Sequence, residues 1–261
     1  GLDDTICFDL VMPSIPGFVF SGAPKYPYGP RKIASYYDKL MTQTLNYESY
    51  FAQGGDWGGA ISTWLGYEHY KNCKGIHLNI MIVRDRNGPQ GEAEKAWQKR
   101  FKNEQSLEEG YRTMQATKPQ TLAFAMTDNP VGIAAWILEK FHGWSDLRKK
   151  SLMEVYGYDD LITNLMLYIL TNSFNTASWI YFGRREEGGR VINFEGGKVE
   201  VPTACALYPK ELLSWPPKSY VDRLFNVVQW NEYSSGGHFA ALEEPDTLVQ
   251  DIRSFFSKIK N

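Results

Sequence analysis

Residues 52–60 read Ala52-Gln53-Gly54-Gly55-Asp56-Trp57-Gly58-Gly59-Ala60 and set one carboxylate between two pairs of glycines. A short apolar run precedes the stretch, and a helical spacing of apolar residues follows it. This is the layout of a nucleophile elbow, a sharp strand-to-helix turn that requires small residues two positions before and after the nucleophile. Gly54 and Gly58 occupy those positions. The stretch therefore predicts Asp56 as an exposed nucleophile, with an ordinary turn as the alternative that a single motif leaves open.

The composition is that of a globular protein. The chain has 261 residues, of which 43% are hydrophobic, which is enough for one large domain or a core domain with an insertion. A net charge of −2 with scattered Lys and Arg provides no basic field, so no nucleic-acid binding is expected. Cys7, Cys73 and Cys205 lack metal-type spacing and are odd in number, which favours thiols in a reducing compartment over a disulfide framework. We expect neither a metal ion nor a cofactor.

The longest apolar runs are far too short to cross a bilayer. Residues 165–170 form one such run, whereas a spanning helix needs about 18 apolar residues or more. The first residues, Gly1 to Thr5, lack the charged start and apolar stretch of a signal peptide. We therefore expect a chain without a membrane span and a cytoplasmic location, and the first residues are typical of the interior of a longer protein.

The order of the elements predicts an α/β fold. Apolar runs at residues 7–12, 50–53 and 75–80 alternate with helical patterns at 31–46 and 57–70, and strands at 199–207 and 224–230 and a helix at 245–258 follow later. Such an order indicates a mostly parallel sheet with helices on both faces and catalytic groups at the carboxyl ends of strands. We expect residues 1–84 and 186–261 to form this core and residues 85–185 to form an inserted helical cap. Most of the four tryptophans of this insertion are expected to pack within the cap: Trp97, Trp136, Trp144 and Trp179.

Two loops that follow the last two strands carry the remaining catalytic candidates. Glu211 follows the strand at 199–207, and His238 follows the strand at 224–230. Together with Asp56 they give the chain order nucleophile, acid, histidine, which is the order of the α/β-hydrolase group. Asp222 competes with Glu211 for the acid position, and Glu211 is preferred because it directly follows a strand.

Several blocks in the same order resemble the epoxide hydrolases of the α/β-hydrolase fold, in particular the microsomal type. The resemblance runs from about Phe8 to the C-terminus. The blocks are Gln53-Gly54-Gly55-Asp56-Trp57-Gly58, Gly75-Ile76-His77-Leu78-Asn79, Thr117-Lys118-Pro119, Asn129-Pro130-Val131-Gly132, Ile137-Leu138-Glu139-Lys140-Phe141 and Gly236-Gly237-His238-Phe239-Ala240-Ala241-Leu242-Glu243-Glu244-Pro245.

The resemblance implies a role for each matching residue. It makes Asp56 the nucleophile, His238 the base that activates water and Glu211 the acid that orients the imidazole. By position in matching blocks, Tyr111 and Tyr181 correspond to the paired phenols of the family, although Trp179 stands where microsomal-type relatives commonly carry a basic residue. The backbone N–H of Trp57 is expected in the oxyanion site. The resemblance further implies hydrolysis of a small lipophilic epoxide to a diol, in detoxification or in aromatic hydrocarbon or lipid epoxide metabolism.

The sequence also departs from the family pattern. A His-Gly-x-Pro segment, which supplies a second oxyanion N–H in relatives, is absent upstream of residues 8–17. The family places a strand between those near Leu10 and Ala52, so we expect a gap inside the sheet and an N-terminally incomplete chain. A full-length protein with a microsomal-type anchor would lie at the cytoplasmic face of the endoplasmic reticulum.

Two other functions remain open at this point. A haloalkane or haloacid dehalogenase also uses an Asp nucleophile and a His in this fold, but binds halide with donors such as paired indoles. A catalytically silent relative that serves as a binding or scaffold protein is the other alternative. The sequence leaves open which epoxide is used, with arene, styrene, lipid and terpenoid epoxides all possible, and it does not indicate an oligomeric state.

Overall fold

The computed structural model describes residues 7–189 and 191–259, so the prediction for Gly1 to Thr5 lies outside the described residues. Its sheet has four parallel strands in the order β1 (Tyr50–Gly54), β2 (Cys73–Leu78), β3 (Val199–Leu207) and β4 (Phe225–Glu232). Around it lie α1 (Pro30–Lys39), a π-helical turn (Leu40–Thr44), α2 (Asp56–Glu68), α9 (Lys218–Asp222), α10 (Ala240–Glu243) and α11 (Pro245–Ile259). The predicted α/β-hydrolase core with a parallel sheet is confirmed.

The strands carry apolar residues toward both faces, because helices cover both. Along β2, Ile76 packs in the main core with residues of α2, while the next side chain, His77, points the other way to Asp251 of α11 at 2.8 Å. This alternation follows from the two-residue period of a strand. Phe255 and Phe256 of α11 complete the second layer against the sheet. The sheet is therefore a buried central layer.

The strand predicted at residues 7–12 is wrong. These residues are irregular, and Leu10 and Met12 are largely exposed. A strand needs a neighbour to pair its N–H and C=O groups, and no described segment lies beside residues 7–12 in a ladder. As a result β1 is the outer strand, and the four described strands pair without the gap that we expected inside the sheet.

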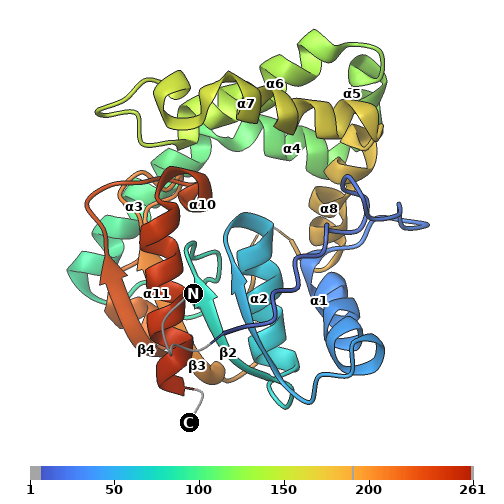
Figure 1. Cartoon of the computed structure of the whole chain (residues 1–261). Coiled ribbons are helices and arrows are strands. Elements are labelled where there is room, and N and C mark those ends of the chain that lie inside the picture. Colours follow the sequence, from blue (N-terminus) through green and yellow to red (C-terminus); the bar gives the residue numbers. More distant parts are fainter. Residues whose placement is uncertain (1–6, 190, 260–261) are drawn as a thin grey trace.

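The described residues between β2 and β3 form six helices: α3 (Gly91–Leu107), α4 (Glu109–Thr117), α5 (Pro119–Met126), α6 (Pro130–Trp144), α7 (Leu152–Leu170) and α8 (Phe174–Glu186). Figure 1 shows α4 to α7 as a layer above the sheet and the surrounding core helices. The expectation that Trp97 packs within this layer is wrong. Its ring lies 4.8 Å from that of Tyr220, in the core cluster that also contains Ile76 of the sheet.

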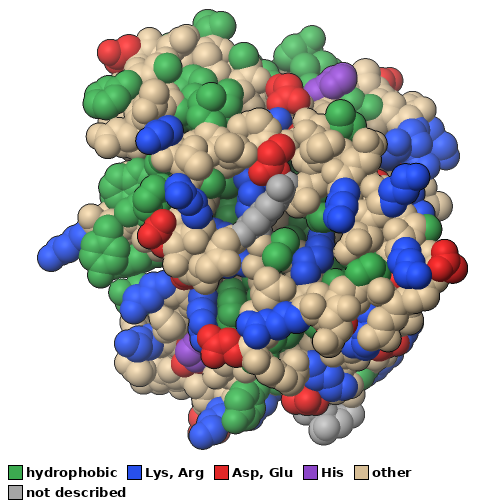
Figure 2. Space-filling view, turned by 180° about the vertical axis from the view of Figure 1, so that it is seen from behind, with side chains coloured by type: hydrophobic (Ala, Val, Ile, Leu, Met, Phe, Trp, Pro, Cys, Tyr) green, Lys and Arg blue, Asp and Glu red, His purple; other side chains and the backbone are tan. Residues whose placement is uncertain are grey.

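Charged side chains are dispersed over the surface. On the face shown in Figure 2, Lys and Arg side chains are separated by uncharged and hydrophobic ones, with Asp and Glu among them. No helix within residues 7–189 and 191–259 is long and apolar enough to cross a membrane.

Candidate active site

Asp56 lies at the point where β1 passes into α2. It is the first residue of the helix and has a φ of +44°, a left-handed conformation that costs an ordinary residue about 1–3 kcal/mol. The turn is so tight that a Cβ at residue 54 would collide with the backbone carbonyl group of Gly58. The predicted elbow is present, and it leaves the Asp56 side chain 55% exposed. Trp57 follows in the first helical turn, where a backbone N–H has no partner within the helix.

The loops after β3 and β4 bring His238 and Glu211 to this carboxylate. His238 Nδ1 lies 2.6 Å from Glu211 Oε1, and its Nε2 lies 3.9 Å from Asp56 Oδ2. A bond from Lys210 N–H to Gly236 O, 3.1 Å long, joins the two loops. Asp222 lies elsewhere, on α9, where it pairs with Lys218 at 2.7 Å. The structure therefore brings together Asp56, Glu211 and His238, and leaves Asp222 outside.

The charge state of His238 follows from its surroundings. Burial alone lowers the pKa of His238, but the charges and hydrogen bonds of Glu211 and Asp56 outweigh it and raise the pKa from 6.5 to about 10. Glu211 is itself buried, and its Oε2 has no hydrogen-bond partner among the described residues, so the imidazolium is its counter-charge. At neutral pH the resting site therefore holds a protonated histidine between two carboxylates.

Two phenols from different helices line the same cavities as Asp56. Tyr111 of α4 and Tyr181 of α8 have ring centroids 5.8 Å apart, and Tyr181 packs edge-on against Trp57 at 4.8 Å. Burial raises the pKa of each phenol, and the negative charge of Asp56 raises it further. Both side chains therefore stay protonated at neutral pH and can donate hydrogen bonds to a group bound beside Asp56.

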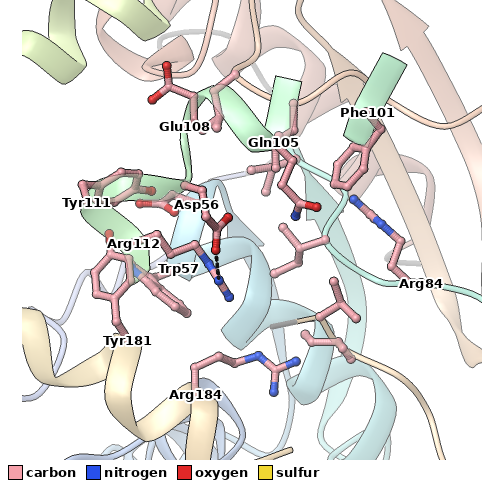
Figure 3. A pocket seen from close by; sticks show the side chains of 17 residues that line it. Asp56, Trp57, Arg84, Phe101, Gln105, Glu108, Tyr111, Arg112, Tyr181 and Arg184 are labelled. Atoms are coloured by element: carbon pink, nitrogen blue, oxygen red, sulfur yellow. Dashed lines mark hydrogen bonds and ion pairs between the residues drawn. The ribbon is translucent and has the colours of Figure 1, made fainter. Parts of the chain in front are cut away.

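Two cavities meet at these residues, and Asp56, Trp57, Tyr111 and Tyr181 line both. The larger, of about 260 Å³, is walled mostly by aromatic side chains, namely Phe18, Trp136, Phe141, Trp144, Tyr168, Phe174 and Phe239. The smaller, of about 100 Å³, has charged side chains in its wall and is drawn in Figure 3. An apolar cavity with a few placed polar groups is the usual form of a small-molecule site.

Comparison with known proteins identifies epoxide hydrolases among the relatives of this chain. The profile of the alpha/beta hydrolase fold matches residues 2–127. Epoxide hydrolase 1 of Sus scrofa is 34% identical over 283 residues, which cover 100% of this chain and 62% of that protein. The chain is an α/β-hydrolase related to the epoxide hydrolases.

Solved structures agree with this family. The juvenile hormone epoxide hydrolase of the silkworm Bombyx mori has a TM-score of 0.81 at 28% identity, covering 95% of this chain and 63% of that one. The epoxide hydrolase of Aspergillus niger has a TM-score of 0.78 at 28% identity, covering 94% and 62%. The chain thus spans about three fifths of the length of these relatives.

Two residues of this α/β-hydrolase site were missed by the sequence reasoning. Trp144 was predicted to pack within the cap, but its ring lies 5.1 Å from that of His238 and its backbone O accepts the His238 N–H at 2.9 Å. Tyr168 of α7 is half-buried in the wall of the larger cavity, where burial raises the pKa of its phenol and the charge of Asp56 raises it further. No local sequence signal distinguishes either residue from a helix-packing aromatic.

The described part of the chain contains no group of three or more His, Cys, Asp or Glu side chains arranged to hold a metal ion. The charged groups around Asp56 instead form pairs with one another, as the bonds of His238 to Glu211 and of Lys140 to Glu108 illustrate. The groups that the structure brings together here are a carboxylate, an imidazole and two phenols.

Proposed function

We propose that this protein hydrolyses small lipophilic epoxides to vicinal diols through a covalent ester on Asp56. The observation that carries the proposal is that Asp56, Tyr111 and Tyr181 line one mostly apolar cavity, with His238 Nε2 3.9 Å from the Asp56 carboxylate. The relatives named above are epoxide hydrolases, which supports the same reaction class. In this proposal residues 85–185 form the cap that supplies both phenols, and residues 1–84 and 186–261 form the core that supplies the other groups.

In the first step, Asp56 Oδ attacks one epoxide carbon from the side opposite the ring oxygen. A new C–O ester bond forms as the ring C–O bond breaks, and the electron pair goes to the ring oxygen. A carboxylate is ionised at neutral pH and needs no base for this step. The developing alkoxide takes a hydrogen bond and then a proton from Tyr111 or Tyr181, whose phenols are still protonated.

In the second step, water cleaves the ester. Once Asp56 is esterified it is neutral, so one of the two anions that raise the pKa of His238 is lost. His238 then returns its proton to the tyrosinate and accepts one from water. The hydroxide attacks the ester carbonyl, the oxyanion faces the Trp57 N–H, and collapse releases the diol and restores the Asp56 carboxylate. Glu211 stabilises the imidazolium.

A dehalogenase is less well supported. Enzymes of that class bind halide with donors such as paired indole N–H groups, and three tryptophans, Trp57, Trp136 and Trp144, line the larger cavity. The Trp144 indole donates its N–H to Glu108 Oε2 at 3.0 Å and the Trp136 indole donates to Gln115 Oε1 at 2.9 Å. Among the described residues of this cavity, the Trp57 indole is therefore left as a single unpartnered donor and does not form a pair. The other alternative, a catalytically silent relative, is distinguished from the proposed enzyme by whether the protein turns over an epoxide.

The test uses styrene oxide and mass spectrometry. The wild-type protein is expected to form phenylethane-1,2-diol. His238→Gln is expected to accumulate a substrate adduct on the peptide that contains Asp56, because hydrolysis of the ester is blocked, and Asp56→Asn is expected to form none. Absence of diol and of any adduct would reject the proposal, and halide release from a haloalkane in that case would favour the dehalogenase.

A further inference from the structure

The smaller cavity differs from the larger one in its charged wall. Its lining includes six long polar side chains, Arg84, Gln105, Glu108, Glu109, Arg112 and Arg184. A purely lipophilic substrate gains nothing from such a wall, because burying charged groups against apolar surface is unfavourable. The wall therefore indicates that a polar part of the ligand enters this cavity.

The acids of this wall already have partners. Glu109 pairs with Arg112 at 3.5 Å, the interaction drawn as a dashed line in Figure 3. Glu108 pairs with Lys140 at 3.4 Å and also accepts from the Trp144 indole. The negative charges of the cavity are thus largely neutralised by cations within hydrogen-bonding or ion-pair distance.

Arg184 of α8 is in a different situation. Only 4% of the residue is exposed, and its Nη2 is buried without a hydrogen-bond partner among the described residues. Its guanidinium extends from α8 into the cavity region (Figure 3). The acid that acts most strongly on it is Glu187, but both oxygens of Glu187 accept backbone N–H groups, from Arg31 at 3.0 Å and Lys32 at 2.9 Å.

A buried guanidinium with an unused donor is costly unless a ligand completes its bonds. A carboxylate is the group that best fits the planar fork of an arginine, because it accepts two parallel N–H bonds and neutralises the charge. The cavity of about 100 Å³ is small, which limits the ligand group to a carboxylate and a short stretch of chain.

We propose that the smaller cavity binds a substrate carboxylate and that Arg184 selects it, so that the substrates are epoxides bearing an acid a few carbons from the ring. The inference rests on the proposed function. The aryl or alkyl end of such a substrate occupies the larger aromatic cavity, the epoxide lies at Asp56, and the acid reaches Arg184.

Binding tests the inference without catalysis. The probes are 4-phenylbutanoate and its methyl ester, which share a shape but differ in charge, with binding measured by calorimetry. The wild-type protein is expected to prefer the acid by about 10- to 100-fold, the range of a charged hydrogen bond. Arg184→Met is expected to abolish this preference. Arg185→Met is the matched control, because Arg185 carries the same charge on the same helix but is exposed, and it is expected to retain the preference.

Equal affinity of the wild-type protein for both probes would overturn the inference, and so would a preference that survives Arg184→Met. If Arg184→Met does not fold, Arg184→Lys decides, because it keeps the charge but loses the fork and is expected to lower the preference without removing it. Turnover of styrene oxide, which has no acid group, reports separately on the proposed function. If the protein binds the acid selectively but forms no diol, the inference of a carboxylate site stands and the proposed hydrolysis is rejected.

Discussion

His238 holds a proton that the two carboxylates beside it keep in place. Glu211 lies 2.6 Å from one ring nitrogen and Asp56 lies 3.9 Å from the other. In the free protein this arrangement favours the imidazolium, which cannot act as a base. In the proposed reaction, esterification of Asp56 removes one anion, so His238 becomes available at the step that needs a base. The proposed order of the two chemical steps therefore follows from the electrostatics of these three residues.

The pKa of His238 provides the first test at this scale. Because the charge of Asp56 contributes to the rise to about 10, Asp56→Asn is expected to lower the pKa of His238. Glu211→Gln is expected to lower it further, because the charge of Glu211 is the largest of the raising effects. NMR titration of the histidine ring protons measures both, and His238→Asn assigns the signal. An unchanged pKa in both variants would contradict this account.

Removal of a phenol provides the second test. Tyr111→Phe and Tyr181→Phe are each expected to lower kcat for styrene oxide by about tenfold or more, and the double variant by about 10² to 10³, the loss seen when a charge-stabilising donor is removed. The matched control is Tyr158→Phe, an exposed tyrosine of α7 that lines neither cavity. A double variant with wild-type kcat would remove the phenols from the mechanism.

How far the sequence predicts the site depends on the residue. Asp56 is marked by its glycines, and His238 and Glu211 by their order after strands. Tyr111 and Tyr181 were assigned only through matching blocks, because 16 tyrosines are present and nothing local separates them. Arg184 and Tyr168 were not singled out, and Trp144 was expected only to pack within the cap. Their approach to the site depends on how cap helices pack on the core, which no short stretch of sequence encodes.

At the scale of elements, the strand-to-helix turn depends on its first glycine more than on its second. A Cβ on residue 54 would meet the backbone of Gly58, whereas a Cβ on residue 58 would meet no atom within 4 Å. Gly54→Ala is therefore expected to destabilise the protein by about 1–3 kcal/mol or more and to displace Asp56. Gly58→Ala is expected to be neutral or to stabilise α2 by up to about 1 kcal/mol.

Urea denaturation of the two glycine variants measures the difference. Equal losses of stability in Gly54→Ala and Gly58→Ala would show that the close approach of the two backbones is not what constrains the turn. Diol formation by Gly58→Ala shows in addition whether an added methyl group beside Asp56 disturbs the reaction.

The strands show which part of the secondary structure cannot be predicted from local sequence. The residues of β3 were predicted with the bounds that the structure gives, because a buried parallel strand has a mostly apolar run between turn signals. Residues 7–12 have a similar run but form no strand. A strand is completed by pairing with a distant segment, so the same local pattern gives different structures depending on what lies beside it.

At the scale of the whole molecule, one buried polar network attaches the C-terminal helix to the sheet. Asp251 of α11 bonds His77 of β2 at 2.8 Å and Gln229 of β4 at 2.9 Å, and it also accepts from Asn231. Burial alone raises the pKa of Asp251, but its hydrogen bonds outweigh burial and lower it below the usual 3.8. Because the depressed pKa favours the folded state above pH 3.8, this contribution is lost only as the pH falls below that value.

Near and above neutral pH, His238 contributes to the pH dependence of stability. Its pKa is about 10 in the folded protein and 6.5 when unperturbed, so the folded state binds more protons between these values. The free energy of unfolding is therefore expected to be highest below pH 6.5 and to fall toward pH 9, by at most about 1.4 kcal/mol per pH unit from this group. His238→Gln is expected to flatten the decline. Urea denaturation at pH 6, 7, 8 and 9 measures it, and a wild-type stability that rises over this range would contradict a protonated His238.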